Sequence, residues 1–458
     1  MTNVSNILNR VGLGARSDET PPTDTQRWLR EQFDAYEPLP VPWKPLSRTA
    51  KLTEAWLTQQ RAARSAPESQ RAGIREAYLR HGRNEYVAAV GARTNSALQT
   101  PTPFVERLVH FWSNHFAVSV DKLLIVGLAG GFEADAIRPN VLGRFEDMLL
   151  AVVRHPAMLL YLDQAQSIGP NSLAGHRRSS DAAQQRRAGL NENLAREIME
   201  LHTLGVRSGY TQADVSEFAR ALTGWTLPSD EPADSLEGIG TFRFASALHE
   251  PGARTVLGRT YAEGGEDQAR GILHDLATSQ ATARHIAFKL ARHFVADEPP
   301  PALVQRLSNT FIRTNGDLPS VYRELVSAPE AQQPALAKFK TPWEWSVSAL
   351  RALGRREMTP QQTTNLMNQL AQPVWRPGSP AGYDDVAGTW AAPDALLRRV
   401  EAAQRIAAQY GGTIDARALA QRVLPGTLSE ATTRAITNAE SGTTALALLL
   451  VSPEFLRR

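Results

Sequence analysis

The densest group of chemically useful side chains lies in residues 191–203, which read Asn-Glu-Asn-Leu-Ala-Arg-Glu-Ile-Met-Glu-Leu-His-Thr. A helix over this stretch puts Asn193, Glu197 and Glu200 on one face, because residues three and four positions apart are neighbours. Two carboxylates on one face can bind a divalent metal ion, or act as the acid and the base of a hydrolytic reaction. His202 lies about 200° around the helix from Glu200, so it cannot share a metal with it in a straight helix. The spacing is not that of a metalloprotease helix.

Arg196 gives the same stretch a second interpretation. It lies four residues from both Glu192 and Glu200, which is the spacing of ion pairs along a helix. An arginine between two glutamates would neutralise them in a buried ion network, and its removal would then cost about 3–5 kcal/mol. The residues alone leave both interpretations open, a catalytic or metal site and a structural network.

Two other short stretches carry candidate side chains. Asn114 and His115 lie near the end of an aromatic-rich helical stretch, where they can face a cleft, or where Asn114 can cap the helix and His115 can pack among the aromatic residues. His249 precedes Glu250 beside a hairpin turn, and a rigid hairpin can direct a histidine into a pocket.

Lys289 is one of only six lysines among the 50 basic residues. With His285 and His293 it recurs at steps of four along one expected helix. A lysine there can bind an anion, or extend its ammonium group out of the core into solvent. The candidate site therefore has four catalytic residues, four substrate-binding residues and two metal ligands: Glu197, Glu200, His202 and His115; Asn114, Asn193, Arg196 and Lys289; His249 and Glu200.

The elements that must position these side chains are mainly helices. Apolar residues recur at steps of three and four, which is the pattern of helices with one face in a core. More than ten such stretches occur along the chain, and those that carry or border the candidate residues are 105–116, 132–153, 191–204 and 282–295.

Two regions interrupt the helical pattern. Within 228–265, short stretches of alternating residues flank a turn at Pro251 and Gly252 and predict a small β-hairpin insertion. Residues 167–189 are rich in serine, arginine, glycine and glutamine and predict a flexible loop. The expected fold is mainly α, a large multi-helix body forming one domain over residues 1–458, with the hairpin inserted in it.

Composition excludes several classes of function. The 458 residues include no cysteine, so disulfide bonds, cysteine nucleophiles and thiolate metal sites are excluded. The net charge is only +3 and the basic residues are not clustered with aromatic ones, so no nucleic-acid partner is expected. The sequence also lacks a phosphate-binding loop, a dinucleotide-binding glycine motif and a serine-hydrolase elbow.

Apolar runs in the chain are short. The longest, 148–153 and 445–451, are about a third of a membrane span, so no membrane-spanning segment is expected. Residues 1–20 lack the apolar core of a signal peptide. The expected location is therefore the cytoplasm, or the periplasm or the outside of the cell if a signal peptide has been removed.

The motifs together resemble a bacterial family called domain of unknown function 1800. The resemblance covers nearly the whole chain and rests on residues 8–15, 111–119, 191–206, 210–225, 249–250 and 289–295. The sequence departs from the family pattern at Leu13, where phenylalanine is usual, and at Glu250, where aspartate is common. The resemblance implies no particular reaction. Members are often exported and are commonly encoded beside relatives of alkaline phosphatases and sulfatases. The resemblance therefore implies a role in the cell envelope or in handling a sulfated or phosphorylated polymer, with such a phosphatase- or sulfatase-like protein as partner.

Two functions are expected as alternatives. The first is an enzyme, a metal- or carboxylate-assisted hydrolase that acts on an anionic or carbohydrate-like substrate, with a divalent metal ion as candidate cofactor. Its pocket would be lined by His115, Glu197, Glu200, His202 and His249. The second is a non-catalytic helical protein for binding or assembly, working with the phosphatase- or sulfatase-like partner.

Overall fold

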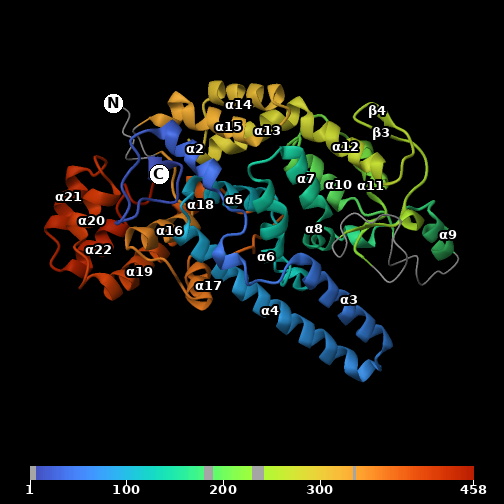
Figure 1. Ribbon diagram of the computed structural model, residues 1–458, viewed down its shortest axis with the longest axis horizontal. Coiled ribbons are helices and arrows are strands. Elements are labelled where there is room, and N and C mark those ends of the chain that lie inside the picture. The colour runs from blue at the N-terminus through green and yellow to red at the C-terminus, as the bar shows by residue number, and fades with distance from the viewer. Residues whose placement is uncertain (1–6, 180–188, 229–241, 334–336) are drawn as a thin grey trace.

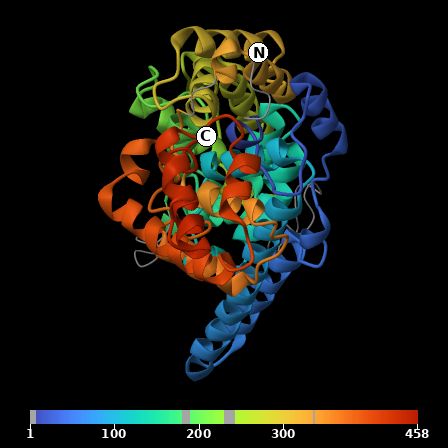
Figure 2. The same ribbon diagram turned by 90° about the vertical axis from the view of Figure 1, so that its left-hand side faces the viewer.

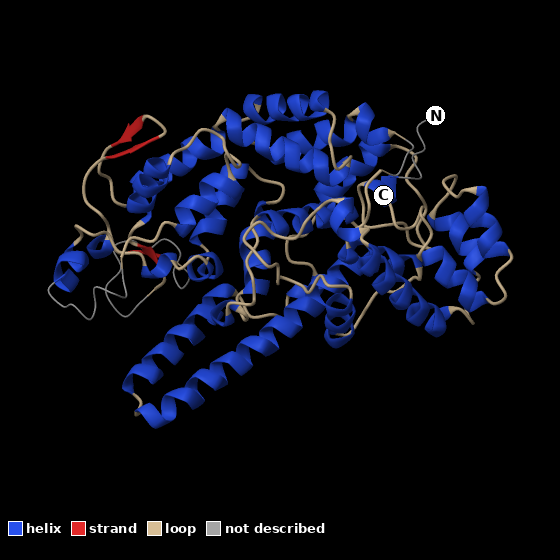
Figure 3. Ribbon diagram, turned by 180° about the vertical axis from the view of Figure 1, so that it is seen from behind, coloured by secondary structure: helices blue, strands red, loops and turns tan. Residues whose placement is uncertain are grey.

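A computed structural model describes residues 7–179, 189–228, 242–333 and 337–458. The described residues form 22 α-helices and two small antiparallel sheets of two strands each, so the mainly α fold is confirmed. The strands lie at one end of the molecule, away from most helices (Figure 3). No described helix combines the length and the hydropathy needed to cross a membrane.

The N-terminal part forms an arm and its base. α1 (Ile7–Arg10) and α2 (Thr25–Ala35) pack on the body, and α3 (Thr49–Ser65) and α4 (Glu68–Gln99) form an antiparallel pair. The pair projects from the body (Figures 1 and 2). Only the last third of α4, from Ala89 onward, is buried along most of its length, and this end reaches the centre of the molecule.

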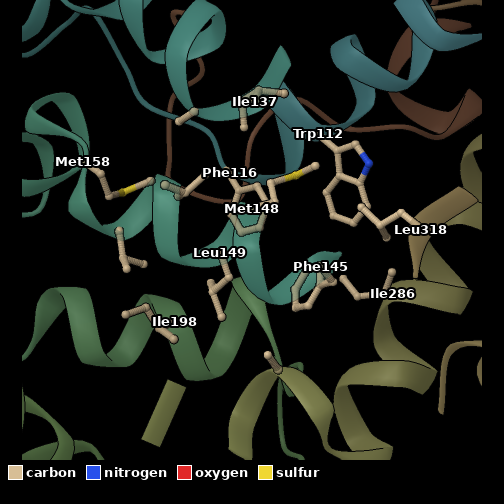
Figure 4. Close-up of a cluster of buried hydrophobic side chains, with 14 of the residues drawn as sticks. Trp112, Phe116, Ile137, Phe145, Met148, Leu149, Met158, Ile198, Ile286 and Leu318 are labelled. Atoms are coloured by element: carbon tan, nitrogen blue, oxygen red, sulfur yellow. The ribbon is translucent and has the colours of Figure 1, made fainter. Parts of the chain in front are cut away.

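The central body contains the largest hydrophobic core (Figure 4). Trp112 and Phe116 lie in it beside Phe145, Met148 and Leu149. The helices of the central body are α5 (Pro103–His115), α6 (Ala129–Phe132), α7 (Phe145–Arg154), α8 (Pro156–Tyr161), α9 (Leu173–Ser179), α10 (Asn193–Glu197), α11 (Gln212–Leu222), α12 (Glu266–Thr278), α13 (Gln280–Phe294), α14 (Pro301–Arg313) and α15 (Leu318–Ser327).

Local sequence signals set several helix ends. α5 begins with a proline at its first turn, where the missing N–H costs nothing. α11 begins with a capping box between Thr211 and Asp214. The stretch 132–153, expected as one helix, is instead broken between α6 and α7, where Pro139 and Gly143 interrupt the regular pattern.

The C-terminal helices surround a second core on the other side of the molecule (Figure 1). A third, smaller core joins the buried end of α4 to this region. The helices are α16 (Pro342–Ala352), α17 (Pro360–Gln369), α18 (Ala387–Trp390), α19 (Pro393–Tyr410), α20 (Ala416–Val423), α21 (Glu430–Thr437) and α22 (Gly442–Leu450). That all 458 residues form one domain stays a prediction.

The hairpin insertion is present, but its turn is not where the sequence indicated. β3 (Arg254–Val256) pairs with β4 (Arg259–Tyr261), and the turn is Leu257–Gly258 rather than Pro251 and Gly252. Both turn residues have positive φ, as a two-residue hairpin turn requires. A separate pair, β1 (Trp225–Thr226) with β2 (Arg243–Phe244), brackets residues 229–241, which lie outside the described residues.

The predicted flexible loop 167–189 is only partly described. Its first half contains the short helix α9, and residues 180–188 lie outside the described residues.

Candidate functional site

A cavity of about 230 Å³ lies between α5, α13, α16 and the segment 372–385. α5 contributes Asn114 and His115 to its wall, and α13 contributes Lys289 and Arg292. Lys289 and Arg292 lie on one face of α13 because they are three residues apart. The cavity thus unites Asn114, His115 and Lys289, three of the predicted site residues, from two helices distant in sequence.

Asn114 fixes the segment that closes one side of the cavity. Its Nδ2 donates to the main-chain oxygen of Tyr383 at 2.9 Å, and its Oδ1 accepts from the Tyr383 N–H at 2.8 Å. Gly382 has φ +82°, and a Cβ there would lie 2.3 Å from the Asn114 main-chain oxygen, so only glycine fits. Asn114 therefore lines the cavity with both ends of its amide already engaged by protein.

The end of the helix that carries the polar motif holds two histidine rings in place. α10 continues into η7 (Ile198–His202), a π-helical turn, and the chain leaves the helix at Thr203. Carbonyls at a helix end have no partner within the helix. Nε2 of His115 lies 3.1 Å from the His202 carbonyl oxygen, and Nε2 of His285 lies 3.1 Å from the Leu201 carbonyl oxygen.

These two contacts determine the tautomer of each ring. A carbonyl oxygen can only accept, so Nε2 carries the hydrogen in both His115 and His285. Nδ1 of each neutral ring is then an unprotonated nitrogen with a basic lone pair. Nδ1 of His115 is buried and has no hydrogen-bond partner in the described part of the chain.

The three histidines form a cluster that stays neutral at pH 7. The ring centre of His115 lies 6.2 Å from that of His202 and 6.1 Å from that of His285. Burial, and after it the positive charge of Lys289, lowers the pKa of His202 to about 3 and that of His285 to about 4. The same two causes lower the pKa of His115 well below its usual value.

Lys289 stands without a counter-charge at this cluster. It is half-buried, and its ammonium group has no hydrogen-bond acceptor and no carboxylate at ion-pair distance among the residues that the structure describes. Burial lowers its pKa to about 8, against the opposing charge of Asp385.

The carboxylates on this side of the cavity are already paired. Glu344 binds Arg107 at 2.9 Å and Arg458 at 2.9 Å. Asp385 accepts from Nδ1 of His293 at 2.6 Å, and Nε2 of His293 accepts from Arg107 at 3.2 Å. These contacts lock the wall in one arrangement, because each buried charge satisfies another.

A second buried network lies behind the opposite wall. Arg138, which is fully buried, binds both Glu106 and Glu133. Burial raises the pKa of Glu106, but the charge of Arg138 and its hydrogen bonds outweigh burial and bring the value down to about 2. Glu133 also binds Arg93 at 2.8 Å and accepts from Nε1 of Trp375 at 3.2 Å, which ties the network to the cavity.

A model of the family described as protein of unknown function (DUF1800) matches residues 6–457. The chain belongs to this family. No curated protein and no solved structure was found to match it.

In this DUF1800 protein the predicted carboxylate pair, Glu197 and Glu200, does not lie in the cavity wall. Glu197 and Glu200 are half-buried and are not among the described residues that line the cavity. Burial, and then the charge of Glu200, raises the pKa of Glu197. Glu200 is a neighbour of Tyr210, whose pKa it helps to raise. Asn193, at the start of the same helix, is exposed.

Arg196 belongs to a surface network, not to the buried one that the sequence allowed. It binds Glu192 at 3.0 Å, and the two side chains are 38% and 29% exposed. Glu192 also accepts from Gln212 and Ser216. The prediction that Glu192, Arg196 and Glu200 form a buried ion network is therefore wrong. A solvent-exposed ion pair contributes only about 0.2–1 kcal/mol to the free energy of unfolding.

His249 lies at the hairpin and is not part of the cavity wall. Its Nδ1 donates to the Thr223 carbonyl at 2.8 Å, and burial lowers its pKa. The described residues contain no group of three or more histidine, aspartate or glutamate side chains arranged to hold a metal ion. A site made of His249 and Glu200 stays a prediction.

Three residues that line the cavity or lie beside it were not among the predicted site residues. His285 and Arg292 lie on the same helix as Lys289, and the step of four from His285 to Lys289 was the signal for the first. Asp385 comes from the proline- and glycine-rich segment 372–385, whose composition predicts a loop but not the helix against which it packs.

Proposed function

We propose that this protein is an enzyme that binds a small anionic substrate in the cavity and uses Nδ1 of His115 as a general base. One observation supports this above all others. An unpaired lysine ammonium and an unpaired basic nitrogen belong to the same cavity, close enough that the charge of Lys289 lowers the pKa of His115. The ammonium group is half-buried and Nδ1 of His115 is buried, and a perturbed, unpartnered basic nitrogen in a cavity is a candidate for contact with a ligand.

The two groups would work together when an anion binds. Lys289 and Arg292 attract a carboxylate, phosphate or sulfate group. The bound anion cancels part of the Lys289 charge, and the pKa of His115 rises because that charge was lowering it. His115 then becomes a better base with substrate present, and its Nε2 hydrogen bond to the His202 carbonyl keeps Nδ1 available. The base could take a proton from water, as hydrolysis requires.

The substrate class is tested with sugars that differ only in charge. Glucose 6-phosphate, glucose 6-sulfate and glucose are titrated into the protein by calorimetry, and the release of phosphate or sulfate is then measured. We expect the two charged sugars to bind and glucose not to bind. Equal binding of all three, or of none, would contradict the anionic substrate.

Variants separate binding from catalysis. His115→Gln keeps an amide N–H where Nε2 was and removes the basic Nδ1, so it should bind the anion and lose turnover. Lys289→Met should lose binding. His274→Gln, on the exposed surface, is the matched control and should change neither. Normal turnover by His115→Gln would refute the role of the base.

The alternative is a binding protein without turnover, working with a phosphatase- or sulfatase-like partner. It is favoured by the state of the two half-buried carboxylates of the cavity, because Glu344 is ion-paired with Arg107 and Asp385 with Lys338, and neither is free to act as an acid. The same titrations decide between the two functions. Tight binding of the charged sugars by the unaltered protein, without release of phosphate or sulfate, would support the binding protein.

A further inference from the structure

Lys289 differs from every other lysine of the chain. Lys122 binds Asp163 at 2.6 Å, Lys338 binds Asp297, and Lys340 donates to Ser348 and to the Phe455 carbonyl. The two remaining lysines, Lys44 and Lys51, are exposed. Only Lys289 combines a place in the cavity with the lack of a partner among the described residues.

The surroundings of Lys289 increase the fraction of its uncharged form at neutral pH. Its neighbours include three neutral histidines, which supply no negative charge. The carboxylate that opposes this effect, Asp385, already accepts from His293 at 2.6 Å and lies 3.5 Å from Lys338. Partial removal of an ammonium group from water without a counter-ion is costly, so its pKa falls and a larger share of Lys289 is the amine at neutral pH. A lysine amine in such a setting is a nucleophile.

The groups around this amine match the needs of one reaction. Arg292, three residues along the helix, lines the same cavity, and its Nε donates to the Asp297 carbonyl at 3.1 Å. Its terminal nitrogens remain for a carboxylate or phosphate. His115 lines the same cavity, and its unprotonated Nδ1 has no hydrogen-bond partner in the described part of the chain. A nucleophile, a base and an anion-binding guanidinium therefore surround one space.

We propose that Lys289 forms an imine with a small anionic carbonyl compound, an aldehyde acid or a 2-oxo acid, bound in the cavity. The proposal rests on the proposed function, since it uses the same anionic site. Nζ attacks the carbonyl carbon, the C–N bond forms, and the carbonyl oxygen takes up a proton. That proton comes from solvent. Nδ1 of His115 accepts one proton from nitrogen and passes it to the hydroxyl group, which leaves as water while the C=N bond forms, and the protonated imine then returns its remaining nitrogen proton to solvent. One amine and one carbonyl give one imine and one water, and no oxidant or reductant takes part.

The test traps the imine and locates it. The intact protein is incubated with glyoxylate and cyanoborohydride, and the modified lysines are identified by mass spectrometry of its peptides. At pH 7 Lys289 should be modified at least about tenfold faster than Lys44 and Lys51, because far more of its amine is uncharged. Its rate should reach half of its maximum near pH 8, the pKa of Lys289. Equal rates at Lys289 and at the exposed lysines, or no modification of Lys289, would overturn the proposal.

Two further measurements distinguish a failure of the imine proposal from a failure of the proposed anionic substrate. Lys289→Arg should abolish the fast phase and Lys51→Arg should retain it, whereas a fast phase that persists in Lys289→Arg would overturn the proposal. Glucose 6-phosphate should slow the modification of Lys289. If that sugar binds while Lys289 stays unmodified, the imine is refuted and the anionic site stands. If Lys289 is modified rapidly while no anion binds or competes, the reactive amine stands and the anionic substrate is refuted.

Discussion

Replacing Lys289 by methionine should make the ligand-free protein more stable at neutral pH. Methionine has a similar length and is apolar, so it fills the same space without a charge. Burial lowers the pKa of Lys289 from 10.5 to about 8. The folded protein therefore holds this proton less tightly than the unfolded chain does. The destabilisation is complete below pH 8 and disappears as the pH rises through 10.5, where the lysine of the unfolded chain also loses its proton.

The size of the effect follows from the same two values. A tenfold change in proton affinity is worth about 1.4 kcal/mol, so a fall of the pKa from 10.5 to about 8 corresponds to roughly 3 kcal/mol. Lys289 is only half-buried, and solvent screens part of this cost. We expect Lys289→Met to raise the free energy of unfolding by about 1–3 kcal/mol at pH 6.5 and by less than about 0.5 kcal/mol near pH 10.5.

Urea unfolding at a series of pH values measures this difference directly. The unaltered protein, Lys289→Met and the exposed control Lys51→Met are followed by circular dichroism from pH 6.5 to 10.5, and the control should track the unaltered protein throughout. A Lys289→Met protein that is less stable at pH 6.5 would refute the reasoning, because the lysine would then have a stabilising partner. A gain that does not change with pH would also refute it, since packing and not charge would be the cause.

Three other substitutions test the contacts around the site. Glu106→Gln should lower the free energy of unfolding by about 3–5 kcal/mol in urea, because it leaves Arg138 with too little negative charge in the core. Arg196→Ala should lower the free energy of unfolding by less than about 1 kcal/mol in the same assay. A decrease of about 3 kcal/mol or more would show that Arg196 belongs to a buried network after all. Gly205→Ala should lower the melting temperature and shift the NMR signals of His285, because Gly205 has φ +90° and a Cβ there would lie 2.8 Å from Nδ1 of that ring. Unchanged signals would show that the two residues are not in contact.

The helices and part of the site could be predicted because their signals are local. The apolar periodicity of 105–116 and 282–295 matches α5 and α13 closely, and these helices bring His115 and Lys289 to one cavity. The step of four between His285 and Lys289 also correctly places both on one helix face.

The predicted carboxylate pair, Glu197 and Glu200, lies outside the cavity for a reason that the sequence itself contains. Spacing shows which residues share a face, but not which face lies in the core. Glu197 and Glu200 share a half-buried face, while Leu194 and Ile198 occupy the buried one. The apolar residues between the acids mark the inward side, and His202 is fully buried on that side.

The cavity wall formed by 372–385 could not be predicted by any local rule. Asn114 bonds to Tyr383 across 269 residues of sequence. Proline and glycine predict that this segment is not helical, but they carry no information on its partner. The two hydrogen bonds of Asn114 and the close approach at Gly382 are consequences of tertiary packing.

The polar motif at 191–203 therefore contributes to the cavity through its backbone. The π-helical turn ends at His202, and Thr203 caps the Ile198 carbonyl through its hydroxyl group at 2.6 Å. The carbonyls of Leu201 and His202 are left to accept from His285 and His115. Because those contacts fix which ring nitrogen is basic, a change in the path of the turn alters the chemistry of the cavity. We expect substitution of the half-buried Glu197 and Glu200 to leave these carbonyls in place, so the geometry of the turn should matter more to this site than the two acids.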